Sequence, residues 1–118
     1  VLAAHPAFSP DGRHLYVSVR GLDEIVLFAL DEDAAPTGRA AFPSGGRGPR
    51  HFSLSPDGRL LAVANQDSDE AVLFALDAAS GAPRELARLS LHRPSCIVWD
   101  AEAGRAGRIS DRMGPLNR

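Results

Sequence analysis

The sequence is poor in the features that identify several common classes of protein. Its 118 residues include one cysteine, Cys96, so no internal disulfide can form, which is compatible with a reducing compartment such as the cytoplasm. No unbroken apolar run exceeds the six residues of Ile25 to Leu30, whereas a membrane-spanning helix needs roughly 20. The N-terminus lacks the basic segment and the apolar core of a secretory signal. We therefore expect a cytoplasmic protein with no membrane partner.

Strong charge and the common cofactor motifs are missing as well. The formal net charge of −2 gives no basic field for a nucleic acid, so we expect no nucleic-acid partner. There is no Cys/His cluster and no nucleophile elbow, and SGGRG at 44–48 has neither the lysine nor the helix of a phosphate-binding loop. The acidic loop Asp67 to Asp69 has too few spaced oxygens for calcium. We expect no metal and no cofactor.

What the sequence does contain is a long internal repeat. Ser9 to Asp31 returns without a gap as Ser55 to Asp77, with a period of 46 residues and 15 identities in 23 positions. The same register pairs His5 with His51. A repeat of this length indicates a supersecondary unit that buries its apolar face against a copy of itself.

Each repeat divides into short apolar stretches separated by turn residues, which favours strands over helices. In the first repeat the predicted strands are Ala7 to Ser9, His14 to Val19, Glu24 to Leu30 and Arg39 to Phe42. The tetrapeptide SPDG at 9–12 and again at 55–58 predicts a tight turn between the first two strands, because Pro presets φ and Gly tolerates a positive φ.

Four antiparallel strands every 40 to 50 residues are typical of a β-propeller blade, so the fold class is all-β. The blade-like repeats span about 5–43 and 50–91, and 95–99 begins a third copy as one extra strand. Because two blades and a strand cannot close a ring of four to eight blades, we expect a piece of a larger propeller; a two-blade unit that closes by self-assembly is the alternative. Residues 100–118, rich in Arg and Gly, are predicted to be a disordered tail.

Strand polarity sorts the polar residues between two ends of the blades. In an antiparallel meander the SPDG turns lie at one end, and the ends of the second strands lie at the other with the starts of the first strands. This second end, where propellers bind ligands, collects the candidate site residues His5, Arg20, Arg50, His51 and Gln66.

Three segments resemble the seven-bladed lactonase family, typified by bacterial 6-phosphogluconolactonase. AAHPAFSPDGRHLYVSVRGLDEIVLF is similar to its penultimate blade, GPRHFSLSPDGRLLAVANQDSDEAVLF to its last blade, and RPSCIVW to its final strand. The resemblance covers Ala3 to about Trp99 and implies the C-terminal part of a hydrolase that opens a sugar lactone with water, in the pentose phosphate pathway. It also implies further blades upstream that hold the catalytic His and Glu, so this chain alone is expected to be inactive.

Two departures from the family pattern favour an alternative, a non-catalytic propeller that serves as a binding scaffold. His5 stands where the family has an acidic residue, and Val19 stands where it has Asn.

The resemblance and the residue chemistry together suggest roles. Arg20 matches the family arginine that contacts an anionic lactone, and its planar fork suits a phosphate or carboxylate. Arg50 and Gln66 are further substrate-binding candidates, and His51 and His5 join Arg20 as catalytic candidates because a histidine can assist water attack. Each has a structural alternative: Arg20 as an exposed loop residue, Arg50 bonded to loop carbonyls, and His5 as a satisfied loop histidine.

The remaining polar positions have a structural interpretation. Asn65 and Gln66 are expected to cap backbone groups where the second strand ends. Because Asp23 and Asp69 are one period apart, we expect them to serve the architecture of the blade.

Overall fold

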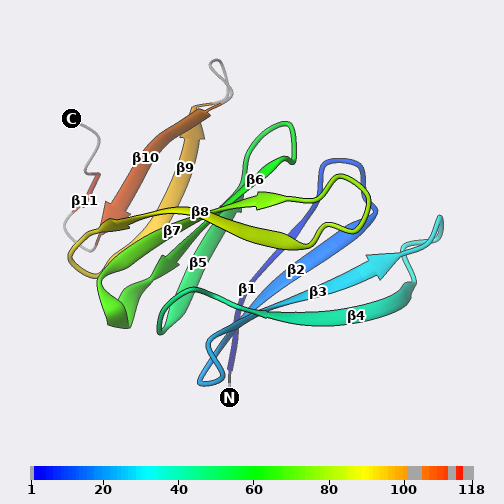
Figure 1. Ribbon diagram of the computed structural model, residues 1–118, viewed down its shortest axis with the longest axis horizontal. Helices are drawn as coiled ribbons and strands as arrows, with labels where there is room; N and C mark the ends of the chain where they lie inside the picture. Colours follow the sequence, from blue (N-terminus) through cyan, green and yellow to red (C-terminus); the bar gives the residue numbers. More distant parts are fainter. Residues whose placement is uncertain (1, 101–104, 112–113, 116–118) are drawn as a thin grey trace.

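The computed structural model describes residues 2–100, 105–111 and 114–115, which form three antiparallel sheets (Figure 1). The first sheet contains β1 (Leu2–Phe8), β2 (His14–Arg20), β3 (Glu24–Leu30) and β4 (Pro36–Pro43). The second contains β5 (Pro49–Leu54), β6 (Leu60–Asn65), β7 (Glu70–Leu76) and β8 (Pro83–Ser90). The third contains β9 (Pro94–Asp100), β10 (Arg105–Asp111) and β11 (Gly114–Pro115). A 3-10 turn, η1 (Gln66–Ser68), follows β6.

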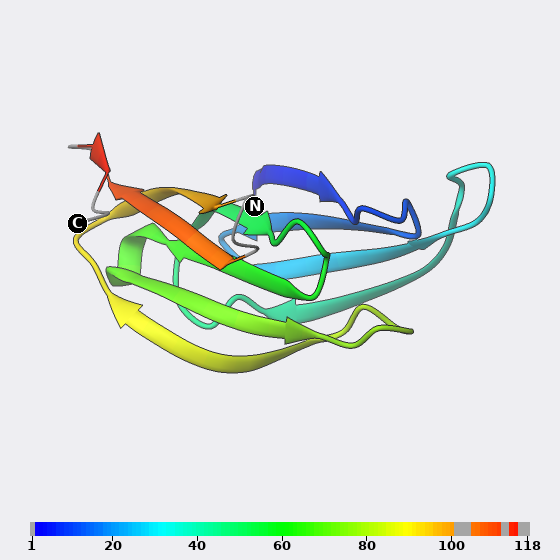
Figure 2. The same cartoon turned by 90° about the horizontal axis from the view of Figure 1, so that it is seen from above.

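Both four-stranded sheets are meanders in which neighbouring strands are antiparallel and follow the order of the sequence. Their registers repeat with the period, since His14 pairs with Ala29 and Leu60 pairs with Ala75. Figure 2 shows β4 and β8 along one side of the molecule and β1 and β9 towards the other. The all-β, blade-like architecture predicted from the repeat is confirmed, and the described sheets do not close a ring.

The tight turn predicted for SPDG is present in both blades. In the first, the Gly12 amide donates to the Ser9 carbonyl at 3.0 Å, and Gly12 has a φ of 74°. The Asp11 carboxylate accepts from the Ser9 hydroxyl at 2.7 Å and from the Arg13 amide at 3.0 Å. The second turn repeats these contacts, with a φ of 75° at Gly58. Glycine is needed here because other residues rarely adopt a positive φ.

The main core lies between the first two blades and takes buried side chains from both: Tyr16, Ile25, Leu27, Phe52, Leu61, Val63, Val72 and Phe74. Burying each large apolar side chain contributes roughly 1.5–3 kcal/mol. Tyr16 also links the blades, because its hydroxyl donates to the Gly81 carbonyl at 2.7 Å. Burial, with a smaller effect from Asp11, raises the pKa of Tyr16 to about 12, so this donor keeps its proton. The first two sheets therefore form one packed unit.

The first strand is longer than the sequence suggested. Ala7 and Phe8 of the predicted strand are the end of β1, which begins at Leu2 and pairs with β2 from Leu2 to Phe8 with one irregularity between Ala3 and His5, whereas Ser9 lies beyond the strand. The sequence of β1 contains Pro6, which has no amide proton to donate. A proline is tolerated because β1 is the edge strand of its own sheet.

The third sheet extends beyond the one strand predicted at 95–99. Two more strands, β10 and β11, lie within 100–118, where the sequence predicted a disordered tail. β10 forms backbone hydrogen bonds with the free edge of β9, and such pairing needs no strong strand propensity in the side chains. The rest of the predicted tail, 101–104, 112–113 and 116–118, lies outside the described residues.

The strands differ in their exposure. β4 and β8, the last strands of their sheets, are almost wholly exposed, whereas β6 is buried over most of its length. Within the described part of the chain, no helix combines the length and the apolar character that crossing a membrane requires.

Candidate functional site

The candidate site lies where β2 and β6 end and where β5 and β9 begin. Because these strands alternate in direction, these ends come to one side of the molecule, opposite the SPDG turns. A cavity of about 480 Å³ opens there, and five residues line it: Arg20, Arg50, Gln66, Arg93 and Ser95. The structure thus brings together Arg20, Arg50 and Gln66, the three residues that the sequence predicted to bind substrate.

Three consecutive sheets contribute to this cavity. Arg20 is the last residue of β2 in the first blade, and Gln66 directly follows β6 in the second. The first strands of the sheets lie next to one another, because β1 contacts β5 and β5 contacts β9. The site is therefore assembled at the junction of blades, as is usual for ligand sites at the mouth of a propeller.

A β-bulge sets the position of Arg50. In the pairing of β5 with β6, Pro49 lies opposite Asn65 and His51 opposite Ala64, which leaves Arg50 as the extra residue. A bulge of this kind redirects side chains at the edge of a sheet, and bulges are common beside functional sites. Arg50 is exposed, and its guanidinium donates no hydrogen bond within the described part of the chain. The alternative in which Arg50 holds loop carbonyls thus has no support in these contacts.

The two histidines form a separate pair on the neighbouring strands β1 and β5. The ring centroids of His5 and His51 are 4.2 Å apart, and the centroid of His5 is 5.0 Å from that of the buried Phe52 in a T-shaped arrangement. Neither histidine lines the arginine cavity. The structure therefore separates these two catalytic candidates from the arginines.

Burial keeps both imidazoles neutral. It lowers the pKa of His5, and it lowers the pKa of His51 to about 4, with the positive charge of a protonated His5 as a second cause. Nδ1 of His51 accepts a hydrogen bond from the Ile97 amide at 3.1 Å. This contact fixes the neutral tautomer that carries its proton on Nε2, so the second ring nitrogen of His51 is a donor.

Gln66 and Asn65 end the second strand of their blade in different ways. The Asn65 side chain donates to the Ser44 carbonyl at 2.9 Å, which confirms the capping role predicted for it. Gln66 is buried, and its backbone amide donates to the Gly48 carbonyl at 2.9 Å. Gln66 is one of the residues that line the cavity, and an amide side chain can donate to an anion.

The periodic aspartates are part of the link between successive blades. Oδ1 of Asp23 accepts from the Gly48 amide at 3.0 Å, and Oδ1 of Asp69 accepts from the Arg93 amide at 2.9 Å. Both aspartates have a positive φ, 57° and 56°. The structural role predicted for this pair is confirmed. Among the described residues, no cluster of three or more His, Cys, Asp or Glu side chains has the geometry to hold a metal ion.

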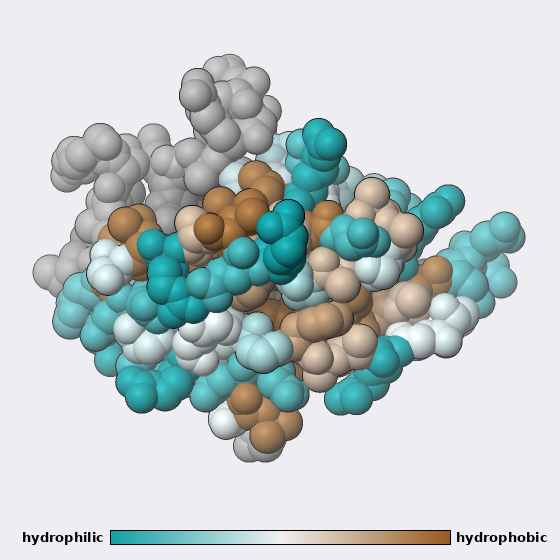
Figure 3. Space-filling model, in the orientation of Figure 1, coloured by the Kyte–Doolittle hydropathy of each residue, from teal (hydrophilic) through white to brown (hydrophobic). Residues whose placement is uncertain are grey.

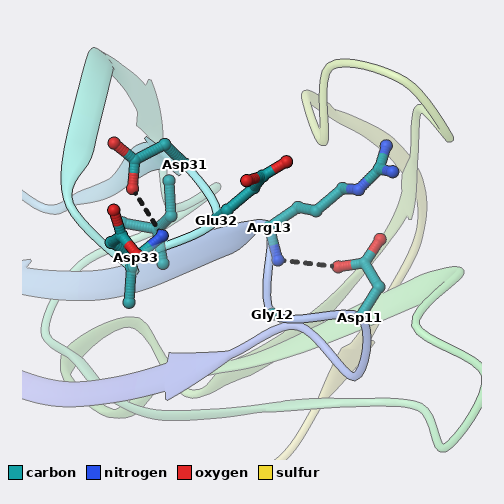
Figure 4. A pocket seen from close by; sticks show the side chains of 8 residues that line it. Asp11, Gly12, Arg13, Asp31, Glu32 and Asp33 are labelled. Atoms are coloured by element: carbon teal, nitrogen blue, oxygen red, sulfur yellow. Dashed lines mark hydrogen bonds between the residues drawn. The ribbon is translucent and has the colours of Figure 1, made fainter.

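A larger cavity, of about 890 Å³, lies at the opposite end of the first blade (Figure 4). Two of its acidic residues are engaged in local hydrogen bonds: Asp11 accepts from the Arg13 amide, and Asp31 accepts from the Asp33 amide at 2.9 Å. These carboxylates stabilise their own turns. We therefore assign the site to the smaller, arginine-lined cavity.

Sequence reasoning missed Arg93 and Ser95. Arg93 lies one period after Arg47, but this signal is ambiguous, because Arg47 is exposed and its guanidinium donates to the Asp67 carbonyl at 3.3 Å. Only the position of β9 against the second blade places Arg93 in the cavity.

Together, the meander topology, the repeated register and the junction of inner strands define the chain as consecutive blades of a β-propeller. Residues 2–99 match the family described as Lactonase, 7-bladed beta-propeller. The chain therefore belongs to the lactonase family of seven-bladed β-propellers. No curated protein matches it.

Solved structures agree with this assignment. The chain is similar to a periplasmic gluconolactonase, PpgL, from Pseudomonas aeruginosa, with 37% identity over 80% of this chain and 27% of that one, and a TM-score of 0.75. A protein from Lactobacillus plantarum has 35% identity over 80% of this chain and 28% of its own, with a TM-score of 0.75. A 6-phosphogluconolactonase candidate from Bacteroides uniformis has 28% identity over 80% of this chain and 28% of its own, with a TM-score of 0.75. The chain thus spans between a quarter and a third of these proteins.

Proposed function

We propose that this chain supplies part of the ligand-binding mouth of a lactonase-type hydrolase that opens a sugar lactone, such as 6-phosphogluconolactone, with water. The observation that carries the proposal is the single cavity shared by Arg20, Arg50 and Gln66 in a chain of the lactonase family. The similarity to a gluconolactonase and to a 6-phosphogluconolactonase candidate supports a sugar lactone as the substrate class. We place this activity in the cytoplasm.

In the proposed reaction, the oxygen of a water attacks the lactone carbonyl carbon, negative charge develops on the carbonyl oxygen, and the ring C–O bond breaks. The proton of the water passes to the ring oxygen that leaves, which yields a hydroxy acid. The guanidinium groups of Arg20 and Arg50 and the amide of Gln66 hold the anionic oxygens of the substrate or of the intermediate.

His51 suits the role of a hydrogen-bond donor better than that of a base, because its Nδ1 is engaged by Ile97. The resemblance implies that the base lies in further blades, which would precede this chain. We expect that the chain alone is inactive, because those blades are required to complete the site.

The test is a lactonase assay on the intact protein that contains this chain. Arg20→Ala is expected to lower kcat/KM about ten- to a hundredfold, because a hydrogen bond to a charged group is worth about 1.5–3 kcal/mol. Arg20→Lys should recover part of the loss. Arg39→Ala, which removes an exposed arginine on the outer strand β4, is the matched control and should change nothing.

Two results would overturn the proposal in different ways. Full activity of Arg20→Ala would remove Arg20 from the mechanism. A folded intact protein that hydrolyses no lactone and captures a protein partner instead would favour the non-catalytic scaffold.

A further inference from the structure

A further cavity, of about 360 Å³, lies between the first two blades at the end that carries the SPDG turns. The two turns meet there, because the ring of Pro10 lies directly beside Gly58. The loop after β7 adds Asp77 and Gly81 to the lining. Both blades therefore form this cavity, and it shares no residue with the arginine cavity.

Three aspartates line the cavity, and each uses one carboxylate oxygen to hold its own turn. Oδ1 of Asp11 and Oδ1 of Asp57 each accept two hydrogen bonds within their SPDG turns, and Oδ2 of Asp77 accepts three within its loop. These hydrogen bonds, above all those from the serine of each turn, lower the pKa of all three carboxyl groups. The second oxygen of each carboxylate receives no hydrogen bond from the described part of the chain, so it is free to accept one from a ligand.

Little positive charge balances these carboxylates. Among the described residues of the lining, Arg59 supplies one guanidinium. Arg59 is exposed and forms no ion pair within residues 2–100, where the ion pairs found involve Arg88 and His92. Because like charges that share a cavity repel one another, a bound cation would stabilise this arrangement.

His14 supplies a second sign of a missing ligand. It lines the cavity with its ring against Gly81, and only 8% of its surface is exposed. Its backbone amide donates to the Ser9 hydroxyl at 3.0 Å, but its ring forms no hydrogen bond within the described part of the chain. Buried polar side chains are almost always paired. The blade itself does not require a histidine here, because Leu60, one period later, makes the same backbone contact with Ser55.

The arrangement of these acceptors indicates the kind of cation. Among the described residues, no three His, Cys, Asp or Glu side chains are placed to hold a single metal ion. The acceptors instead surround a volume that suits a small organic molecule. An ammonium group has three N–H donors and a guanidinium has five, so an organic cation can reach several separate acceptors at once.

We propose that this cavity binds an organic cation with several N–H donors, an alkyl guanidinium or ammonium group, through Asp11, Asp57, Asp77 and His14. The carboxylates supply charge-assisted hydrogen bonds, and the neutral imidazole supplies one more acceptor. This inference goes beyond the proposed function and does not depend on it, because the site lies at the opposite end of the blades from the arginines.

Binding of agmatine, which carries one guanidinium and one ammonium group, tests the site in the intact protein at pH 8 and low ionic strength. Titration calorimetry should show saturable binding that weakens as salt is added. Asp11→Asn keeps an acceptor for its turn and removes the charge, so the affinity should fall about three- to tenfold. Asp31→Asn is the matched control, because Asp31 also holds its own turn but lies outside this cavity; it should change the affinity less than twofold.

Two further variants test the acceptor and the sign of the charge. His14→Leu copies the residue found at Leu60 and should weaken binding about threefold or more, and His14→Gln, which keeps an acceptor, should weaken it less. Arg59→Ala removes a like charge and should strengthen binding. Weaker binding in Arg59→Ala, or equal effects of Asp11→Asn and Asp31→Asn, would overturn the proposal even if the His14 variants failed to fold.

The guanidinium could belong to a free amine or to an arginine side chain of a partner protein, and a second probe distinguishes these sources. Acetyl-arginine amide carries its guanidinium on a peptide backbone. Tighter binding of this probe than of agmatine would identify a protein side chain as the ligand, and the reverse order would identify a free amine; both results uphold the site. Absence of saturable binding by either probe would overturn it, whatever the lactonase activity of the same preparation.

Discussion

At the scale of single residues, His51 shows how one contact from a neighbouring sheet changes the chemistry of a side chain. The Ile97 amide donates to Nδ1 of the imidazole, and burial, with His5 beside it as a second cause, disfavours its charged form. Ile97 lies one period after His51, so the contact joins equivalent positions of successive sheets. A histidine expected from its residue type to titrate near neutrality is thus held neutral.

The stability of the protein should therefore depend on His51 at acid pH. The pKa of His51 is about 4 in the folded protein and near 6.5 when unfolded, so below pH 6.5 the unfolded state binds the extra proton. Stability is full above pH 6.5 and is lost progressively towards pH 4, by about 1–3 kcal/mol for a partly exposed ring. Urea unfolding of the intact protein at pH 7.5 and 4.5 measures this loss.

His51→Asn removes the titration and keeps an acceptor for the Ile97 amide, so the pH-dependent loss should shrink. His92→Asn, at an exposed position, is the control. An equal loss between the two pH values in wild type and His51→Asn would contradict the assignment. His5 contributes in the same direction, because burial lowers its pKa as well.

The sequence predicted which site residues lie at the same end of the blades, but it did not predict the hydrogen bonds that they form. Strand polarity alone placed Arg20, Arg50 and Gln66 at one end of the blades. The bond between His51 and Ile97, and the position of Arg93, depend on how β9 packs against the second blade. Packing between sheets is not encoded in any local pattern, and for this reason Arg93 was missed.

At the scale of elements, the loops after β2 and β6 join each blade to the next. Asp23 and Asp69 adopt a positive φ, and each accepts a backbone amide of the following linker with its carboxylate. Aspartate and asparagine tolerate this conformation better than most residues, because their short polar side chains bond locally. Both the aspartate and its backbone conformation therefore recur with the 46-residue period.

Replacing Asp23 should separate the contribution of its carboxylate acceptor from that of its positive φ. Asp23→Asn keeps an acceptor for the Gly48 amide and should lower the free energy of unfolding by less than about 1 kcal/mol. Asp23→Ala loses the acceptor and places Cβ in an unfavourable region, so we expect a loss of about 2–4 kcal/mol. Thermal or urea unfolding of the intact protein measures both.

Asp23→Gly distinguishes the loss of the hydrogen bond from the backbone strain, because it removes the acceptor while glycine adopts a positive φ without strain. A stability midway between those of the Asn and Ala variants is expected. Equal stability of the Asn and Ala variants would show that the contact with Gly48 contributes nothing.

The strands themselves were predictable where the period repeats them. The extended β1 and the strand β10 were not, because both depend on pairing with a partner edge rather than on their own residues. Local propensity is weak evidence for a strand whose hydrogen bonds are supplied by its neighbour.

At the scale of the whole molecule, the blades leave apolar surface uncovered. Large apolar side chains are exposed at Phe8, Leu22, Leu86, Leu89 and Val98. Beside β9, a groove of about 190 Å³ is lined almost entirely by apolar atoms of the second blade, among them Val72, Leu73 and Leu89. Apolar side chains are visible on the face drawn in Figure 3. In a seven-bladed ring, such faces are covered by neighbouring sheets.

The 118-residue chain by itself should therefore associate in solution, because exposed apolar faces and free strand edges both promote contacts between copies. Sedimentation velocity at increasing protein concentration is expected to show a shift from monomer to larger species. Leu89→Lys and Val98→Lys, at half-exposed positions, should reduce the shift, since a charge on the contact surface is unfavourable. Ala79→Lys, in the exposed loop after β7, adds the same charge away from the groove and should not. A monodisperse monomer that melts cooperatively would instead mean that the core around Tyr16 and Phe52 stabilises two blades without the rest of a ring.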